Sequence, residues 1–249
     1  MTNNNMIFIA NWKMNGEKSH ISGINKTIKF LKQSKNKKNQ IIYCPPFTLI
    51  SSVKNKVKNS KIKVGAQNLS QLNDYGAFTG SVNSKLIKSA GGDYVIVGHS
   101  ESRDQENDTL INKKIHSALK EKLKVILCIG ETYKEKKNNK TFSVLKRQIT
   151  IGLKNIKKIN NIIFAYEPRW AIGTGKIPKS SELRKNFKDI NNIINKLKKN
   201  QKYKIIYGGS VNLKNVLDLK KINDLNGFLI GSASLRAKNF IDIIKKSTN

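Results

Sequence analysis

Residues 162–175 read Ile-Ile-Phe-Ala-Tyr-Glu-Pro-Arg-Trp-Ala-Ile-Gly-Thr-Gly, and no other stretch says more about this chain. An apolar run ends at Tyr166, the carboxylate of Glu167 follows, and Pro168 leads into a turn rich in glycine. Short apolar runs bounded by turn residues are typical of buried strands, and backbone N–H groups in a glycine-rich turn can bind an anion. The stretch therefore predicts a base at the end of a strand, beside an anion-binding turn. The alternative is an exposed glutamate before an ordinary turn.

Similar apolar runs recur along the chain and alternate with stretches of helical spacing such as Ile21, Ile24, Ile28 and Leu31. Runs that are nearly continuous in apolar residues are typical of parallel strands covered on both faces. Eight strand–helix units in 249 residues predict an α/β fold, a closed (β/α)8 barrel of eight parallel strands. A doubly wound open sheet is the alternative. The predicted strands are 6–10, 40–44, 62–66, 93–97, 124–129, 162–166, 203–207 and 227–230.

Length and composition predict one domain over residues 1–249, because no low-complexity linker or break in composition divides the chain. No segment approaches the run of about 18 apolar residues that a membrane span needs, and the first five residues lack the pattern of a secretory signal. We therefore expect a cytoplasmic protein without a membrane partner. Cys44 and Cys128 lie in apolar runs, which predicts two buried free thiols, and the three scattered histidines predict no metal site.

The net charge of +32 points to nucleic acid or another polyanion as a candidate partner. Only five of the 48 basic residues are arginine, although arginine is favoured for bidentate contacts with phosphates and bases. The lysines are spread over nearly every predicted helix with few aromatic residues among them. We therefore predict no specific nucleic-acid partner. A polyanion-binding barrel stays as an alternative, which one continuous basic face without acidic interruption would favour.

Polar and glycine residues gather directly after the predicted strands. In a closed (β/α)8 barrel the groups that follow the strands meet on one rim, where active sites lie. The sequence therefore predicts that one site collects these residues: Asn11 and Lys13 after the first strand, His99 after the fourth, Glu167 after the sixth, Gly208-Gly209-Ser210 after the seventh and Gly231-Ser232 after the eighth.

Taken in order, seven segments closely resemble the triosephosphate isomerase family, and the resemblance covers essentially the whole chain. It implies a TIM barrel that interconverts dihydroxyacetone phosphate and glyceraldehyde 3-phosphate through an enediol(ate), in glycolysis and gluconeogenesis, without a cofactor. Another phosphosugar-acting barrel enzyme is a further alternative. The segments are Asn11 to Gly16, Gly65 to Asn68, Gly76 to Gly80, Gly98 to Glu101, Cys128 to Glu131, Tyr166 to Pro168 with Trp170 to Gly175, and Tyr207 to Val211.

The resemblance also implies roles for four residues. Glu167 is the base, held out of bulk water by a closing loop. His99 is the electrophile that polarises the substrate carbonyl as a neutral imidazole, a known property of this family. Lys13 supplies a fixed positive charge for the dianionic substrate and the developing enediolate, and Asn11 donates an amide hydrogen bond to a substrate oxygen. Glu101 is expected to pair with Lys13 and orient the site, or else to cap a turn.

The implied phosphate site consists of backbone N–H groups of Gly173, Ser210, Gly231 and Ser232. The implied lid excludes water from the intermediate. In the family the loop around Thr79 inserts into a partner subunit, so a homodimer is expected. The lid is Pro168, Arg169, Trp170, Ala171, Ile172, Gly173, Thr174, Gly175 and Lys176.

Four positions depart from the family pattern. Arg169 replaces a small apolar hinge residue, so its head must reach solvent or find an acidic partner. Ser232 replaces a glycine, which matters only if that backbone needs a positive φ. Ser81 replaces an acidic residue and Ser102 an arginine, which predicts the loss of one ion pair at the dimer interface. Such a pair, if exposed, is worth only about 0–1 kcal/mol.

Overall fold

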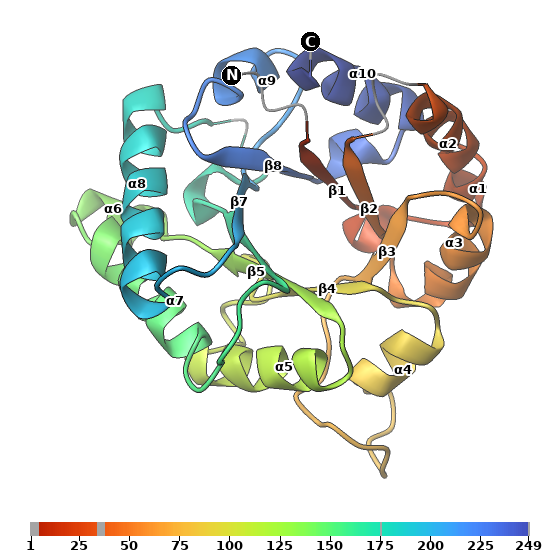
Figure 1. Ribbon diagram of the computed structural model, residues 1–249, viewed down its shortest axis with the longest axis horizontal. Coiled ribbons are helices and arrows are strands. Elements are labelled where there is room, and N and C mark those ends of the chain that lie inside the picture. Colours follow the sequence, from red (N-terminus) through yellow and green to blue (C-terminus); the bar gives the residue numbers. More distant parts are fainter. Residues whose placement is uncertain (1–4, 34–37, 175, 249) are drawn as a thin grey trace.

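A computed structural model describes residues 5–33, 38–174 and 176–248. Eight parallel strands form one closed barrel in sequence order, and helices surround it on the outside (Figure 1). The strands are β1 (Ile7–Asn11), β2 (Gln40–Cys44), β3 (Lys63–Ala66), β4 (Tyr94–Val97), β5 (Lys124–Ile129), β6 (Ile162–Tyr166), β7 (Lys204–Tyr207) and β8 (Leu225–Ile230).

The pairing of β8 with β1 closes the barrel, with Ile7 opposite Gly227 and Ile9 opposite Leu229. An open doubly wound sheet would leave two edge strands, so this alternative is wrong and the predicted closed barrel is confirmed. The observed strand ends lie within two residues of the predicted ones.

The helices between the strands are α1 (Lys18–Ile21), α2 (Ile24–Lys32), α3 (Ile50–Val57), α4 (Ser84–Ser89), α5 (Asp108–Lys120), α6 (Tyr133–Lys137), α7 (Thr141–Gly152), α8 (Ser180–Leu197), α9 (Val216–Leu219) and α10 (Ala237–Thr248). Short 3-10 turns follow the strands at Lys13–Asn15 (η1), Phe47–Leu49 (η3), Arg169–Ala171 (η4) and Ser232–Ser234 (η5). A long loop between β3 and α4 projects away from the ring of helices (Figure 1).

Strand side chains alternate between two apolar layers, which explains why the runs are almost continuously apolar. One layer fills the inside of the barrel and includes Ile9, Ile96 and Ile126. The other packs between the barrel and the helices and includes Phe8, Val95 and Phe164. This double burial fixes the barrel and therefore the positions of the loops that follow each strand.

Both cysteines are free and buried inside the barrel, as predicted. Burial raises the pKa of both thiols well above the ordinary range, so neither is an activated nucleophile. In the described part of the chain, no three His, Cys, Asp or Glu side chains lie together as metal ligands would. None of the helices described is long and apolar enough to cross a bilayer.

Candidate active site

The carboxyl ends of the strands surround a cavity of about 250 Å³. The fold brings residues from widely separated parts of the sequence to it, as the rim position of the polar residues predicts. Glu167 and Asn11 are not among the lining residues. Glu167 lies next to His99, which lines the cavity, and Asn11 is hydrogen-bonded to Lys13, which also lines it. The cavity is lined by Lys13, His99, Ile172, Gly173, Gly208, Gly209, Ser210, Val211, Asn212, Leu229, Gly231, Ser232 and Ala233.

Glu167 directly follows β6 and is only 1% exposed. Its Oε2 accepts a hydrogen bond from the backbone N–H of Ser100 at 3.4 Å, and its Oε1 is buried without a hydrogen-bond partner in the structure. Oε1 lies 3.7 Å from Nε2 of His99, which itself lines the cavity. A buried carboxylate oxygen without a partner is costly to folding, and this cost marks Glu167 as a group kept for chemistry rather than for stability.

The space for Glu167 depends on a glycine. A Cβ atom at Gly208 would lie 2.6 Å from Cγ of Glu167 and 2.9 Å from its Oε1. Since carbon atoms that are not bonded to each other do not approach this closely, any side chain at position 208 would displace the carboxylate. The loop after β7 thus contributes to the site twice, as cavity lining and as the wall behind the base.

The protonation of His99 follows from its neighbours. The backbone N–H of Glu101 donates to Nδ1 of His99 at 3.2 Å, so Nδ1 must be the nitrogen that carries a lone pair. With Nδ1 as the acceptor, the ring proton lies on Nε2, the nitrogen nearer to Glu167. Residues 99–102 form a hydrogen-bonded turn, in which the backbone N–H of Ser102 donates to the carbonyl of His99 at 2.9 Å. This turn supplies the N–H group that Nδ1 accepts from.

Lys13 and Glu101 form the ion pair that the sequence predicted, with Nζ and Oε1 2.5 Å apart. Lys13 adopts a left-handed backbone conformation, with φ of 51°, which is uncommon outside glycine. Two contacts hold it there: Asn11 Oδ1 accepts from the Lys13 backbone N–H at 3.0 Å, and Gln67 Nε2 donates to the Lys13 carbonyl at 2.9 Å. Gln67 belongs to a segment that carried the resemblance, but no pattern in the sequence singles it out for a role.

The four residues predicted to bind phosphate all line the cavity: Gly173 from the segment after β6, Ser210 after β7, and Gly231 and Ser232 after β8. Ser210 also donates its hydroxyl hydrogen to the carbonyl of Ala171 at 2.8 Å, which ties the β7 loop to the segment after Glu167. Ser232 is not among the described residues with a positive φ, so its Cβ is accommodated without strain. Gly173 has φ of 71°, a conformation that favours glycine.

The segment after Glu167 begins with Pro168 and the turn η4, and a second buried carboxylate anchors it. Glu131 Oε1 accepts from the indole N–H of Trp170 at 2.8 Å, and its Oε2 accepts from the hydroxyl of Tyr166 at 3.1 Å. The Glu131 backbone carbonyl accepts from the N–H of Arg169 at 2.9 Å. Burial raises the pKa of Glu131 above its ordinary value. Nothing in the sequence distinguished Glu131 as an anchor.

Arg169 finds an acidic partner, which resolves the question that the sequence left open. Its Nη2 lies 2.5 Å from Oδ1 of Asp104, in the loop that follows His99. Of the predicted lid, Gly175 lies outside the described residues; Ile172 and Gly173 reach the cavity. The start of the lid segment is therefore held by two contacts, one with Glu131 and one with Asp104.

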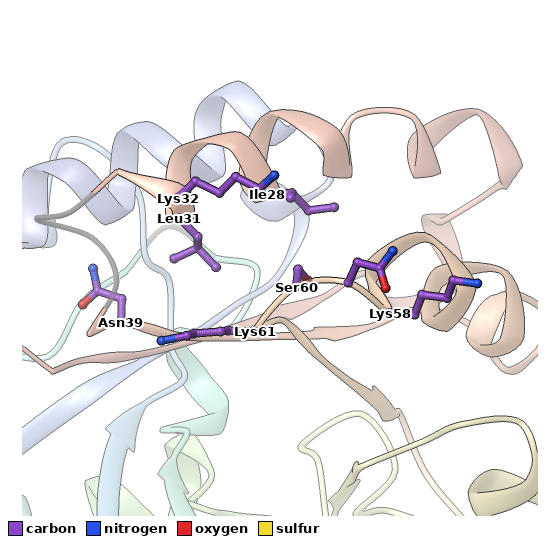
Figure 2. A pocket seen from close by; sticks show the side chains of 8 residues that line it. Ile28, Leu31, Lys32, Asn39, Lys58, Ser60 and Lys61 are labelled. Atoms are coloured by element: carbon purple, nitrogen blue, oxygen red, sulfur yellow. The ribbon is translucent and has the colours of Figure 1, made fainter.

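A larger cavity, of about 540 Å³, lies away from this site between the ends of α2 and α3 (Figure 2). The side chains of Lys32, Lys58 and Lys61 line it but extend in different directions, and Ile28 and Leu31 form its apolar part. Among the described residues that line it, there is no pair of a base and a polarising group comparable to Glu167 and His99.

The chain is similar to known proteins along nearly its whole length. The family model described as triosephosphate isomerase matches residues 6–247. The chain is 39% identical to the triosephosphate isomerase of Alkaliphilus metalliredigens, with 96% of this chain and 98% of the relative covered. It is also 39% identical to that of Endomicrobium trichonymphae, over 97% and 98% of the two chains.

A solved structure of triosephosphate isomerase from Bartonella henselae superposes with a TM-score of 0.89 at 31% identity, covering 98% of this chain and all of the other. The closed barrel, the residues collected on its rim and the full-length similarity agree, and the chain belongs to the triosephosphate isomerase family.

Proposed function

We propose that Glu167, His99, Lys13 and Asn11 carry out the family's reaction in this chain. Membership of the family means that the enzyme interconverts dihydroxyacetone phosphate and D-glyceraldehyde 3-phosphate through an enediol(ate) in glycolysis. The observation that carries the assignment of the base is the buried Oε1 of Glu167, without a partner and 3.7 Å from the ring of His99.

In the proposed mechanism Glu167 removes a proton from the carbon next to the carbonyl, and the electron pair of that C–H bond moves towards the carbonyl oxygen. The N–H at Nε2 of His99 donates a hydrogen bond to this oxygen, and the ammonium group of Lys13 stabilises its negative charge. The hydroxyl hydrogen on the first carbon passes to the former carbonyl oxygen. As the protonated Glu167 returns its proton to the neighbouring carbon, the C=C bond of the enediolate is lost and the first carbon becomes the new carbonyl. A neutral imidazole suits this role because Nε2 keeps its proton while Nδ1 accepts from the backbone.

We propose that the N–H groups of Gly173, Ser210, Gly231 and Ser232 hold the substrate phosphate. Their presence in the lining of one cavity supports this, as does the general occurrence of phosphate sites after the last two strands of such barrels. Asn11 Oδ1 accepts from the Lys13 backbone N–H, and its amide Nδ2 is the group that donates to a substrate oxygen. Glu101 orients Lys13 through their ion pair.

The proposal is tested by a coupled assay of glyceraldehyde 3-phosphate isomerisation with the wild-type protein and Glu167→Asp. The shorter side chain withdraws the carboxylate from the substrate while keeping its charge, so kcat should fall by about 10²-fold or more with little change in KM. Wild-type activity at background level would overturn the assignment of the site. A fully active Glu167→Asp would assign the base elsewhere.

We further propose a homodimer of single-domain (β/α)8 subunits, with the loop around Thr79 reaching the partner. Large apolar side chains are exposed on this loop, with exposures of 67% for Tyr75 and 51% for Phe78, and Met14 in the turn after β1 is 97% exposed. Exposed apolar groups that gather in this way favour a protein partner. Sedimentation should give twice the monomer mass; a monomer with full activity would contradict the dimer.

We also propose that the enzyme works in the cytoplasm and has no specific nucleic-acid partner. The cytoplasmic location rests on the family's place in glycolysis. Acidic side chains interrupt the lysines on several helices, as in the pairs Lys54–Asp93, Lys136–Glu182 and Lys238–Asp242. An interrupted surface of this kind supports only weak, salt-sensitive attraction to polyanions.

A further inference from the structure

The ion pair between Arg169 and Asp104 joins two segments that the reaction uses for different purposes. Arg169 is the second residue after the proposed base and the first of the turn η4. Asp104 lies 65 positions earlier, in the loop that begins with His99. The side chain of Arg169 is mostly covered, with 21% exposed, whereas the side chain of Asp104 is 81% exposed.

The loop that carries Asp104 is firmly held. Its neighbour Arg103 donates to the carbonyls of Gly98 and Cys128, at 2.9 and 2.7 Å, and pairs with Asp108 at 2.8 Å. Asp104 is thus fixed relative to the ends of β4 and β5. The same loop presents the N–H of Ser100 to the carboxylate of Glu167.

On the lid side of the pair, Glu131 holds the backbone N–H of Arg169 and the indole of Trp170. Further along, the hydroxyl of Ser210 donates to the carbonyl of Ala171, and Ile172 and Gly173 line the cavity. The ion pair with Asp104 thus adds a charged contact at the surface to the buried contact with Glu131, at the start of the lid.

We propose that Arg169 and Asp104 are positioning residues, whose ion pair holds the lid hinge against the loop of His99 and so slows the escape of the phosphorylated substrate from under the lid. The proposal rests on the assignment of residues 168–176 as the lid. Neither residue lines the cavity, so the pair acts through the hinge and not on the reacting atoms. Loss of the pair should raise KM and leave the proton-transfer step itself intact.

The test is a double-mutant cycle on KM for glyceraldehyde 3-phosphate with Arg169→Gln, Asp104→Asn and the double variant. Each single variant should raise KM about two- to fivefold, the range expected of an exposed ion pair. The double variant should be no worse than either single one. Asp104→Glu, which keeps the charge, should restore most of the wild-type KM. In NaCl the KM ratio of Asp104→Asn to wild type should fall towards one as salt screens the pair.

A matched control uses the exposed pair of Lys221 and Asp218, whose Nζ and Oδ1 are 3.0 Å apart on and beside α9. Asp218→Asn removes the same charge far from the lid and should leave KM unchanged. Hydrogen exchange of peptides spanning residues 168–178 should be faster in Asp104→Asn than in either the wild type or Asp218→Asn.

Two outcomes would overturn the proposal: strictly additive effects on KM in the cycle, or unchanged KM and unchanged hydrogen exchange in both single variants. A loss of kcat in Glu167→Asp tests the base alone. A failure of the ion-pair proposal can therefore be told apart from a failure of the catalytic assignment.

Discussion

Glu131 and Glu167 are two buried carboxylates at the ends of neighbouring strands, and they are treated in opposite ways. Glu131 is fully buried, and both of its oxygens accept hydrogen bonds, from Trp170 and Tyr166. Glu167 is 1% exposed and keeps Oε1 without a partner beside the cavity. Burial therefore does not distinguish an anchor from a base. In this pair the difference is the oxygen of Glu167 that has no donor and lies beside the cavity, because an oxygen that is already satisfied has little left to offer a substrate proton.

The contrast between the two carboxylates is tested most directly by the same substitution, glutamate to glutamine, at both positions. Glu167→Gln removes the base and should lower kcat by about 10²–10⁴-fold, the range of general acid–base catalysis. Glu131→Gln keeps an oxygen acceptor for the indole N–H and should lower kcat by about fivefold or less, since one hydrogen bond is worth about 1 kcal/mol. Steady-state kinetics on both proteins at one pH would check this. Equal losses of kcat would show that the two carboxylates share one task.

A second test keeps both glutamates and displaces only the carboxylate of Glu167. Gly208→Ala adds a Cβ that meets Cγ of Glu167 at 2.6 Å, whereas Glu131 is not among the three nearest contacts of this added atom. A displacement of the base by about 1 Å should lower kcat by about 10²-fold. Thermal denaturation of the same variant serves as the control for folding. A fully active Gly208→Ala would mean that the carboxylate has room to spare.

The smallest expected effect concerns pH and stability. The pKa of Glu131 is raised by burial from its ordinary value of 4.5. Between that value and the folded one, the folded protein holds a proton that the unfolded chain has lost. The contribution of Glu131 to the free energy of unfolding is therefore complete below pH 4.5 and falls as pH rises through the folded pKa.

Urea denaturation of the wild type and Glu131→Gln, followed across this range of pH, measures that contribution. The wild type should lose stability relative to the variant as pH rises, because glutamine stays neutral. A difference between the two proteins that does not change with pH would contradict the raised pKa. Changes shared by both curves come from other groups.

The sequence predicted the barrel because continuous apolar runs report burial on both faces, and it placed the strand ends within two residues. It was less exact where a periodic pattern crosses a break. The spacing from Ile21 to Leu31 suggested one helix, whereas α1 ends at Ile21 and α2 begins at Ile24. Apolar periodicity records which face is buried, and it continues here because Ser22 and Gly23 keep a helical backbone while the hydrogen bonds change to i→i+3.

The site residues were predictable where position after a strand singled them out, as for His99 and Glu167. Their supports were not. Asp104 lies 65 residues from its partner, so only the tertiary fold brings the pair together. Gln67 acts through its side-chain amide on two backbone carbonyls, of Lys13 and Cys44. Contacts of this kind produce no periodic pattern in the sequence, because they join loop residues whose spacing follows neither a helix nor a strand.

The left-handed backbone conformation of Lys13 opposes the stability of the fold to the activity of the enzyme at one residue. Such a conformation costs a residue other than glycine about 1–3 kcal/mol, and here it places the ammonium group at the cavity. Glycine or asparagine would relieve that strain, and either would remove the cation. At residue 13 a substitution that stabilises the fold would therefore be expected to cost turnover, because the strained backbone and the cation belong to the same residue.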